Sequence, residues 1–142
     1  MENLGVFGKN FQENLCKLLV QDRAFCDQMQ EVLDISFLEL KHLQVLTKKI
    51  FEYRDKYGVH PSYRIVETII ELENDVIQKQ VKDFFVRVQS ASELTDTEYI
   101  KSASLDFCKK QVLKDAMMQS VPLLNQCSFE EIEKLITKAL RS

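Results

Sequence analysis

Apolar residues recur every three or four positions along most of this chain, which is the spacing of one face of an α-helix. The pattern predicts a series of helices separated by short polar segments. These helices are expected to begin near Phe11, Asp22, Ser36, Ser62, Asn74, Thr95 and Ser128. Most of the chain is therefore expected to be helical, in an all-α fold.

Several of the expected helix ends carry capping signals. Three S/T-x-x-E segments predict capping boxes, in which two side chains satisfy backbone donors of the first turn: Ser36 to Glu39, Thr95 to Glu98 and Ser128 to Glu131. Gly58 follows the stripe of the third helix and is expected to supply a left-handed C-cap. Pro61 then favours an extended conformation at the residue before it.

The chain divides into three expected parts. Residues 1–10 contain Gly5 and Gly8 and read as a flexible leader. Residues 11–93 form a compact helical head. The polar, unpatterned stretch "QSASELTD" marks the expected boundary, and residues 94–142 are expected to form a helical hairpin or the start of a linker. The first helix of this last part is expected to run to Pro122, which makes it unusually long.

That long helix contains "LDFCKKQVLKDAMMQSV", which is apolar on two nearly opposite faces. A surface helix needs only one apolar stripe, so a second stripe is either covered within the chain or shared with a partner. The pattern alone leaves these alternatives open. One stripe contains Ala103, Phe107, Met117 and Val121, and the other contains Leu105, Cys108, Val112 and Ala116 at the spacing of a helix–helix seam.

Composition and net charge argue against several classes of protein. The chain has 142 residues, of which 45% are hydrophobic and 29% charged, with three glycines and two prolines. This composition argues against intrinsic disorder and against a loop-rich β fold. The formal net charge of −3 lacks the basic excess that non-specific nucleic-acid binding usually requires.

No residue set predicts a catalytic or metal site. Four widely spaced cysteines and two histidines, His42 and His60, do not match zinc-ligand spacing. Cys16 and Cys108 lie in apolar runs and read as small core residues. Neither a Walker phosphate-binding loop nor a G-x-G-x-x-G motif occurs. We expect no cofactor and no metal, and a protein that is not an enzyme.

The sequence also lacks targeting signals. Its first ten residues have neither a basic region nor an apolar one, and no run approaches the ~20 apolar residues of a membrane span. We expect a cytoplasmic domain with reduced thiols and no membrane contact.

Three segments resemble the N-terminal domain of DnaB-type hexameric replicative helicases, particularly those of tailed bacteriophages. They are "FQENLCKLLVQDRAFCDQM", "FLELKHLQVLTKKIFEYRDKYGVHPS" and "EYIKSASLDFCKKQVLKDAMMQSVPLL". The second is similar to the family's long helix with its Y-x-x-x-P-S exit, here Tyr57 to Ser62. The third is similar to the family's hairpin, entered at Glu98-Tyr99-Ile100. The resemblance covers residues 11 to 140 and rests on the order of these segments.

The resemblance implies a non-catalytic assembly domain. Such domains form a collar on the helicase ring, in which hairpins of neighbouring subunits pack into dimers, often as a trimer of dimers. The collar receives a primase or a helicase loader, and DNA is contacted only indirectly, through the full-length helicase. The motor domain that hydrolyses nucleotide is not in this sequence, so we expect either an excised domain or a stand-alone relative, and favour the excised domain. The source expected is a bacterium or a phage-infected cell. Residues 129–140 are either the second hairpin arm or the start of the linker helix to the absent motor domain.

The resemblance favours one assignment of the two stripes. Ala103, Phe107, Met117 and Val121 are expected to face the head or the hairpin partner. Leu105, Cys108, Val112 and Ala116 are expected to form an oligomer interface. Two other classes remain as alternatives: a single-stranded nucleic-acid-binding helical module that uses Lys109, Lys110 and Lys114, and a small enzyme with a cysteine nucleophile.

Overall fold

The computed structural model describes residues 2–90 and 96–141. Within these residues the chain forms seven α-helices, two short 3-10 helices and no strand, which confirms the all-α prediction. The α-helices are α1 Lys9–Gln21, α2 Arg23–Val32, α3 Lys41–Tyr57, α4 Tyr63–Ile70, α5 Asp75–Ser90, α6 Thr97–Asn125 and α7 Phe129–Arg141. The 3-10 helices are η1 Leu4–Phe7 and η2 Ile35–Phe37.

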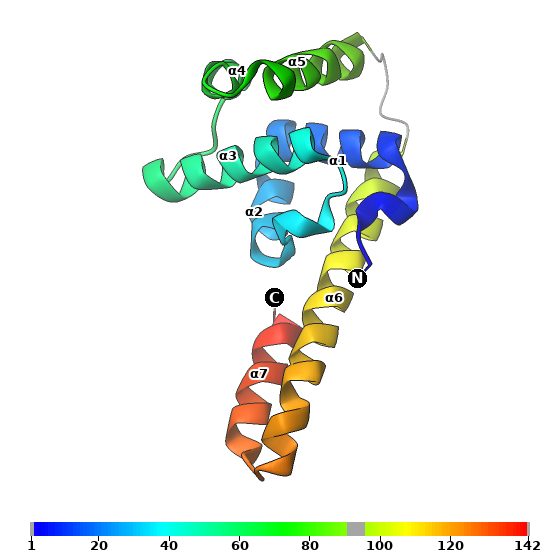
Figure 1. The fold of residues 1–142 in the computed structure, drawn as a ribbon, viewed down its shortest axis with the longest axis vertical. Helices are drawn as coiled ribbons and strands as arrows, with labels where there is room; N and C mark the ends of the chain where they lie inside the picture. The colour runs from blue at the N-terminus through cyan, green and yellow to red at the C-terminus, as the bar shows by residue number, and fades with distance from the viewer. Residues whose placement is uncertain (1, 91–95, 142) are drawn as a thin grey trace.

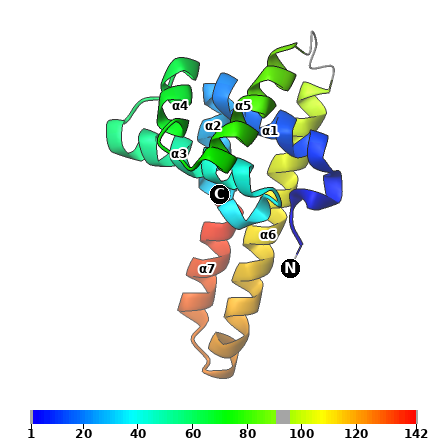
Figure 2. The ribbon, with the colours of Figure 1, turned by 45° about the horizontal axis from the view of Figure 1, so that its top comes forward.

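Helices α1 to α5 gather at one end of the molecule, and the long helix α6 runs from this head into a two-helix projection (Figure 1). Helix α7 turns back along α6, so that the end of the chain lies close to the head (Figures 1 and 2). The arrangement is thus a head followed by a hairpin, in which residues 129–141 form the second arm.

The core lies in the head and includes the first half of α6. Helix α1 lies at its centre and packs against α2, α3, α5 and α6. Its Leu15 and Leu19 are fully buried, as are Leu43 and Leu46 of α3. Each such side chain contributes about 1.5–3 kcal/mol by leaving water. Lys101 of α6 adds an ion pair, with its Nζ 2.5 Å from Asp22 at the junction of α1 and α2.

The prediction of a flexible leader over residues 1–10 is wrong for the residues from Leu4 onward. Leu4 is fully buried, and η1 positions Phe7 with its ring centroid 4.4 Å from that of Phe11. Helix α1 begins at Lys9, two residues before the apolar pattern starts. The expectation failed because Gly5 lies inside a 3-10 turn and Gly8 caps it, and this turn is anchored to the core through Leu4.

Three helix ends have the caps that the sequence predicts. Gly58 adopts the left-handed conformation (φ 69°) that the sequence predicts after α3. The side chains of Asp22 and Ser62 accept hydrogen bonds from the backbone N–H groups of Phe25 and Ile65, as N-caps do.

The capping box predicted at Ser36 is wrong. Asp34 accepts the hydrogen bond from the N–H of Ser36 and starts η2, and α3 begins only after Leu40. Thr95 lies outside the described residues, and α6 begins at Thr97 without a side-chain bond from Asp96. Helix α7 begins directly after Ser128, as predicted.

Helix α6 does not end at Pro122 but continues to Asn125. A proline this close to a helix end removes a single intrahelical hydrogen bond, whereas the helix gains a satisfied end further on. The N–H groups of Ser128 and Cys127 bond the carbonyls of Leu123 and Leu124 at 2.9 and 3.1 Å, which is a Schellman motif. Cys127 occupies its left-handed position with φ 55°.

Candidate interaction surfaces

The four residues predicted to form an oligomer interface are covered by their own chain. Cys108 is fully buried and Ala116 is 6% exposed, while Leu105 and Val112 are half-buried against the core. Helix α6 packs against α1 and α2 in the head and against α7 along the hairpin (Figure 2). This stripe therefore offers a second subunit little surface in the folded chain, which disfavours its assignment to a partner.

The exposed apolar face of α6 is instead formed by Met117, Val121 and Leu124, which we call the outer row. Their side chains are 58%, 59% and 58% exposed. The spacing of four and then three residues is that of a coiled-coil seam. The sequence assigned Met117 and Val121 to packing within the chain, and this is wrong. Phe107, from the same predicted stripe, is buried as expected.

The outer row is exposed, whereas Phe107 of the same stripe is buried, because α6 leaves the head between them. Near Phe107 the head still surrounds the helix on several sides. Beyond that point α7 is the main neighbour of α6 and covers another side of it. One apolar stripe therefore changes from buried to exposed along a single helix.

The lysines predicted to contact nucleic acid lie on the surface of α6, where Lys110 and Lys114 are one turn apart on one face and Lys109 lies off that face. Lys109 and Lys110 point about 100° apart around the helix. Lys114 lines a hollow of about 580 Å³ together with the acidic Glu2, Asp34 and Asp115. The aromatic side chain of that hollow, Phe37, is 5% exposed and cannot stack on a base.

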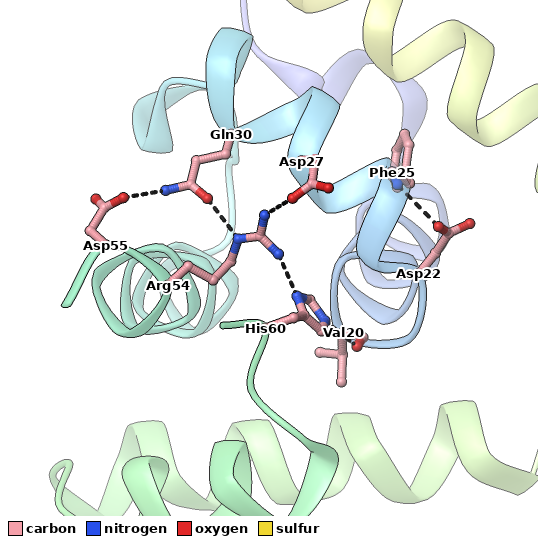
Figure 3. A network of polar contacts seen from close by, with 8 residues as sticks. All are labelled: Val20, Asp22, Phe25, Asp27, Gln30, Arg54, Asp55 and His60. Atoms are coloured by element: carbon pink, nitrogen blue, oxygen red, sulfur yellow. Dashed lines mark hydrogen bonds and ion pairs between the residues drawn. The ribbon is translucent and has the colours of Figure 1, made fainter. Parts of the chain in front are cut away.

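A polar network around Arg54 holds the exit of α3 against α2 (Figure 3). The guanidinium donates from Nε to Gln30 Oε1 at 2.8 Å and also bonds the carboxylate of Asp27. Its Nη1 lies 2.6 Å from His60 Nδ1, and His60 Nε2 lies 2.8 Å from the carbonyl oxygen of Val20. A carbonyl only accepts, so Nε2 carries the proton and Nδ1 accepts from Arg54. Through its two ring nitrogens His60 thereby links the last turn of α3 to the end of α1.

The buried thiols lack the ionisation that a cysteine nucleophile needs. Burial raises the pKa of Cys16 and of Cys108 to about 12, and the pKa of Cys26 to about 11. Cys16 also lies 3.6 Å from the Thr47 hydroxyl. These three side chains serve as core residues, as the sequence indicates for Cys16 and Cys108.

The part of the chain that the structure describes contains no cluster of three or more His, Cys, Asp or Glu side chains that could hold a metal ion. Among those same residues, no helix combines the length and apolar character needed to cross a membrane.

A polar layer inside the head was not predicted from the sequence. It lies between α1 and the helices α3 and α5. Arg87 bonds Glu13 at 2.8 Å, and Lys17 Nζ donates to the Val88 carbonyl at 2.8 Å. His42 is also buried there, and in the described residues its Nε2 has no hydrogen-bond partner. Charged residues within the α1 pattern were the available signal, but helical periodicity assigns such residues to the surface by default.

Comparisons with protein-family models, with curated proteins and with solved structures gave no match to this chain.

Proposed function

We propose that this chain is a non-catalytic assembly domain, of the kind found at the N-terminus of DnaB-type replicative helicases. It self-associates through its hairpin as a dimer or trimer of dimers, receives a primase or loader, and approaches DNA only through the full-length helicase. The cytoplasm of a bacterial or phage-infected cell is the corresponding location. The observation that carries the proposal is the outer row on the projecting hairpin.

The outer row has the properties of a self-complementary contact. Met117, Val121 and Leu124 repeat at seam spacing on an exposed helix face. In a dimer with two-fold symmetry each of them is buried twice, once per subunit. Complete burial of such a side chain contributes about 1.5–3 kcal/mol. The lysines Lys110 and Lys114 precede the row toward the head and limit the apolar contact to the distal half of α6.

Sedimentation velocity over a concentration series tests this proposal. The chain is expected to self-associate, and Val121→Glu is expected to shift it to monomer, because the substitution places a charge within the seam. Val76→Glu is the matched control, since Val76 is an exposed valine of α5 in the head, 67% exposed against 59% for Val121. Circular dichroism checks that both variants keep their helices.

Two results would contradict the proposal. One is a wild-type chain that stays monomeric at high concentration. The other is a Val121→Glu variant that associates as strongly as wild type and the Val76→Glu control.

The alternative of a single-stranded nucleic-acid-binding module has less support, because Lys114 lies among carboxylates and the nearby aromatic is buried. A titration with labelled single-stranded DNA at low and high salt separates the two functions. Binding that weakens steeply with salt, and is lost in a Lys109, Lys110 and Lys114 triple alanine variant, would favour the alternative.

A further inference from the structure

Helices α4 and α5 enclose a groove on the head, with a volume of about 290 Å³. Its floor is apolar and consists of Ile70, Val81 and Phe85, which are at most 5% exposed. The ring of Tyr63 lies across one side of it, 4.9 Å from that of Phe85 between centroids. We call this feature the α4–α5 groove.

The α4 rim of the groove carries two carboxylates, from Glu67 and Glu71, one helical turn apart. Two like charges at this spacing repel each other. They also lie in the last turn and at the C-cap of α4, where the helix dipole disfavours negative charge. Both residues are exposed, and in the described residues neither makes an ion pair.

The cations nearby in the chain do not relieve this repulsion. Lys82 on the opposite rim donates to Gln78 Oε1 at 3.3 Å instead of to either carboxylate. Lys49 pairs with Glu73, just beyond α4, at 3.4 Å. The fold thus neutralises the neighbouring acid and leaves Glu67 and Glu71 available to a cation from outside the chain.

The α5 rim adds an apolar contact. Val86 is 67% exposed there, on the helix face opposite to the one that carries the buried Phe84. An apolar floor, an exposed apolar rim and an acidic rim together match a helix that presents apolar anchors along one stripe and cations beside them.

We infer that the α4–α5 groove docks a basic amphipathic helix of a partner protein. Apolar side chains of that helix enter the groove above Ile70 and Phe85, and a lysine or arginine beside them pairs with Glu67 and Glu71. This inference rests on the partner-docking part of the proposed function and supplies a surface and a partner chemistry for it. The two rim carboxylates repel nucleic acid, so a nucleic-acid ligand does not fit.

The test uses two fluorescein-labelled peptides and fluorescence anisotropy. The basic peptide is a helix with leucines four residues apart and lysines or arginines along one flank, and the acidic peptide replaces those cations by glutamates. The wild-type chain is expected to bind the basic peptide and not the acidic one. The variant E67K/E71K is expected to bind the basic peptide at least tenfold more weakly and to gain binding of the acidic peptide.

Matched controls separate the groove from the overall charge. The variant E52K/D83K makes the same change in net charge at exposed acids outside the groove, and it is expected to keep the wild-type preference. Val86→Glu is expected to weaken binding of the basic peptide, whereas Val76→Glu is not. Circular dichroism of each variant confirms that it is folded.

The inference is overturned if the basic peptide fails to bind the wild-type chain at low salt, or binds wild type and E67K/E71K equally. It is also overturned if Val86→Glu lowers the sedimentation coefficient, because a second copy of the chain then occupies the groove. Failure of this docking site is distinguishable from failure of the proposed self-association. E67K/E71K is expected to leave sedimentation unchanged, and Val121→Glu is expected to leave peptide binding unchanged.

Discussion

Helix α1 in the head and helix α7 in the hairpin have the same length of 13 residues but very different surroundings. α1 packs against four other α-helices and has nine buried residues, whereas α7 packs mainly against α6 and has one, Ala139. α1 can therefore bury Glu13 and Lys17 in the polar layer, because several neighbours supply partners for them. A two-helix hairpin offers one covered side per helix, so its remaining apolar residues stay at the surface.

Because more side chains are buried in the head, we expect it to carry most of the folding stability, while the hairpin presents a surface. Truncating a side chain in the core of the head leaves a cavity. Truncating one in the outer row removes an exposed side chain and is expected to change the stability of the monomer little.

Truncating one leucine in each region gives the largest contrast. Leu46→Ala in the head is expected to lower the free energy of unfolding by about 3 kcal/mol, because Leu46 is fully buried. Leu124→Ala in the outer row is expected to change it by less than about 0.5 kcal/mol in the monomer. Urea unfolding at low protein concentration measures both values. Equal losses would mean that the hairpin is packed as tightly as the head.

Removing Arg54 tests the polar network that joins α2, α3 and the segment at His60. Arg54→Ala is expected to lower the free energy of unfolding by about 2 kcal/mol, because Gln30 and His60 lose a charged donor. Arg23→Ala provides the control, since Arg23 is an exposed arginine at the start of α2 with no hydrogen bond or ion pair in the described residues. If the network does not stabilise the fold, the two variants will have the same free energy of unfolding.

The turn of the hairpin is expected to tolerate a stabilising change. Cys127→Gly relieves a left-handed conformation that costs an L-residue roughly 1 kcal/mol. Cys127→Ala keeps that cost and serves as the control. Hydrogen exchange of the α7 amides is expected to slow in the glycine variant alone. Unchanged exchange would show that the hairpin opens without its turn unfolding.

Acid is expected to weaken the head through His42. Burial lowers the pKa of His42 below its ordinary value of 6.5, so the unfolded chain takes up the proton more readily than the folded chain. Stability therefore falls as the pH drops below about 6.5, and the contribution is fully recovered above it. Urea unfolding at several pH values is expected to show a weaker pH dependence in His42→Gln than in wild type. Parallel curves would contradict a buried, neutral His42.

Much of the helical outline was predictable because its signals are local. Gly58 and Ser62 act through backbone groups within four residues of themselves, and both predictions are confirmed. Ser36 and Pro122 carry signals of the same kind, yet neither marks the helix boundary that the sequence predicts. At Ser36 the neighbouring Asp34 takes the capping role, and at Pro122 the Schellman closure further along outweighs one missing hydrogen bond.

The candidate surfaces were less predictable. Periodicity identifies that α6 is apolar on two sides, but both stripes have equal claim to the core in the sequence. The α4–α5 groove depends on which sides of α4 and α5 face each other, and the acidic rim has meaning only beside its apolar floor. Neither relation is present in the order of residues along the chain.

An all-α chain and most of the helix positions could be predicted from the sequence, because both follow from backbone hydrogen bonding and the 3.6-residue repeat. Whether residues 129–140 return along α6 or lead away from it stayed open at that level. The packing of the helices, by contrast, covers Cys108 and Ala116 and leaves Met117, Val121 and Leu124 exposed. The physical reason is that burial depends on the number and direction of neighbouring helices, and that number falls where α6 leaves the head.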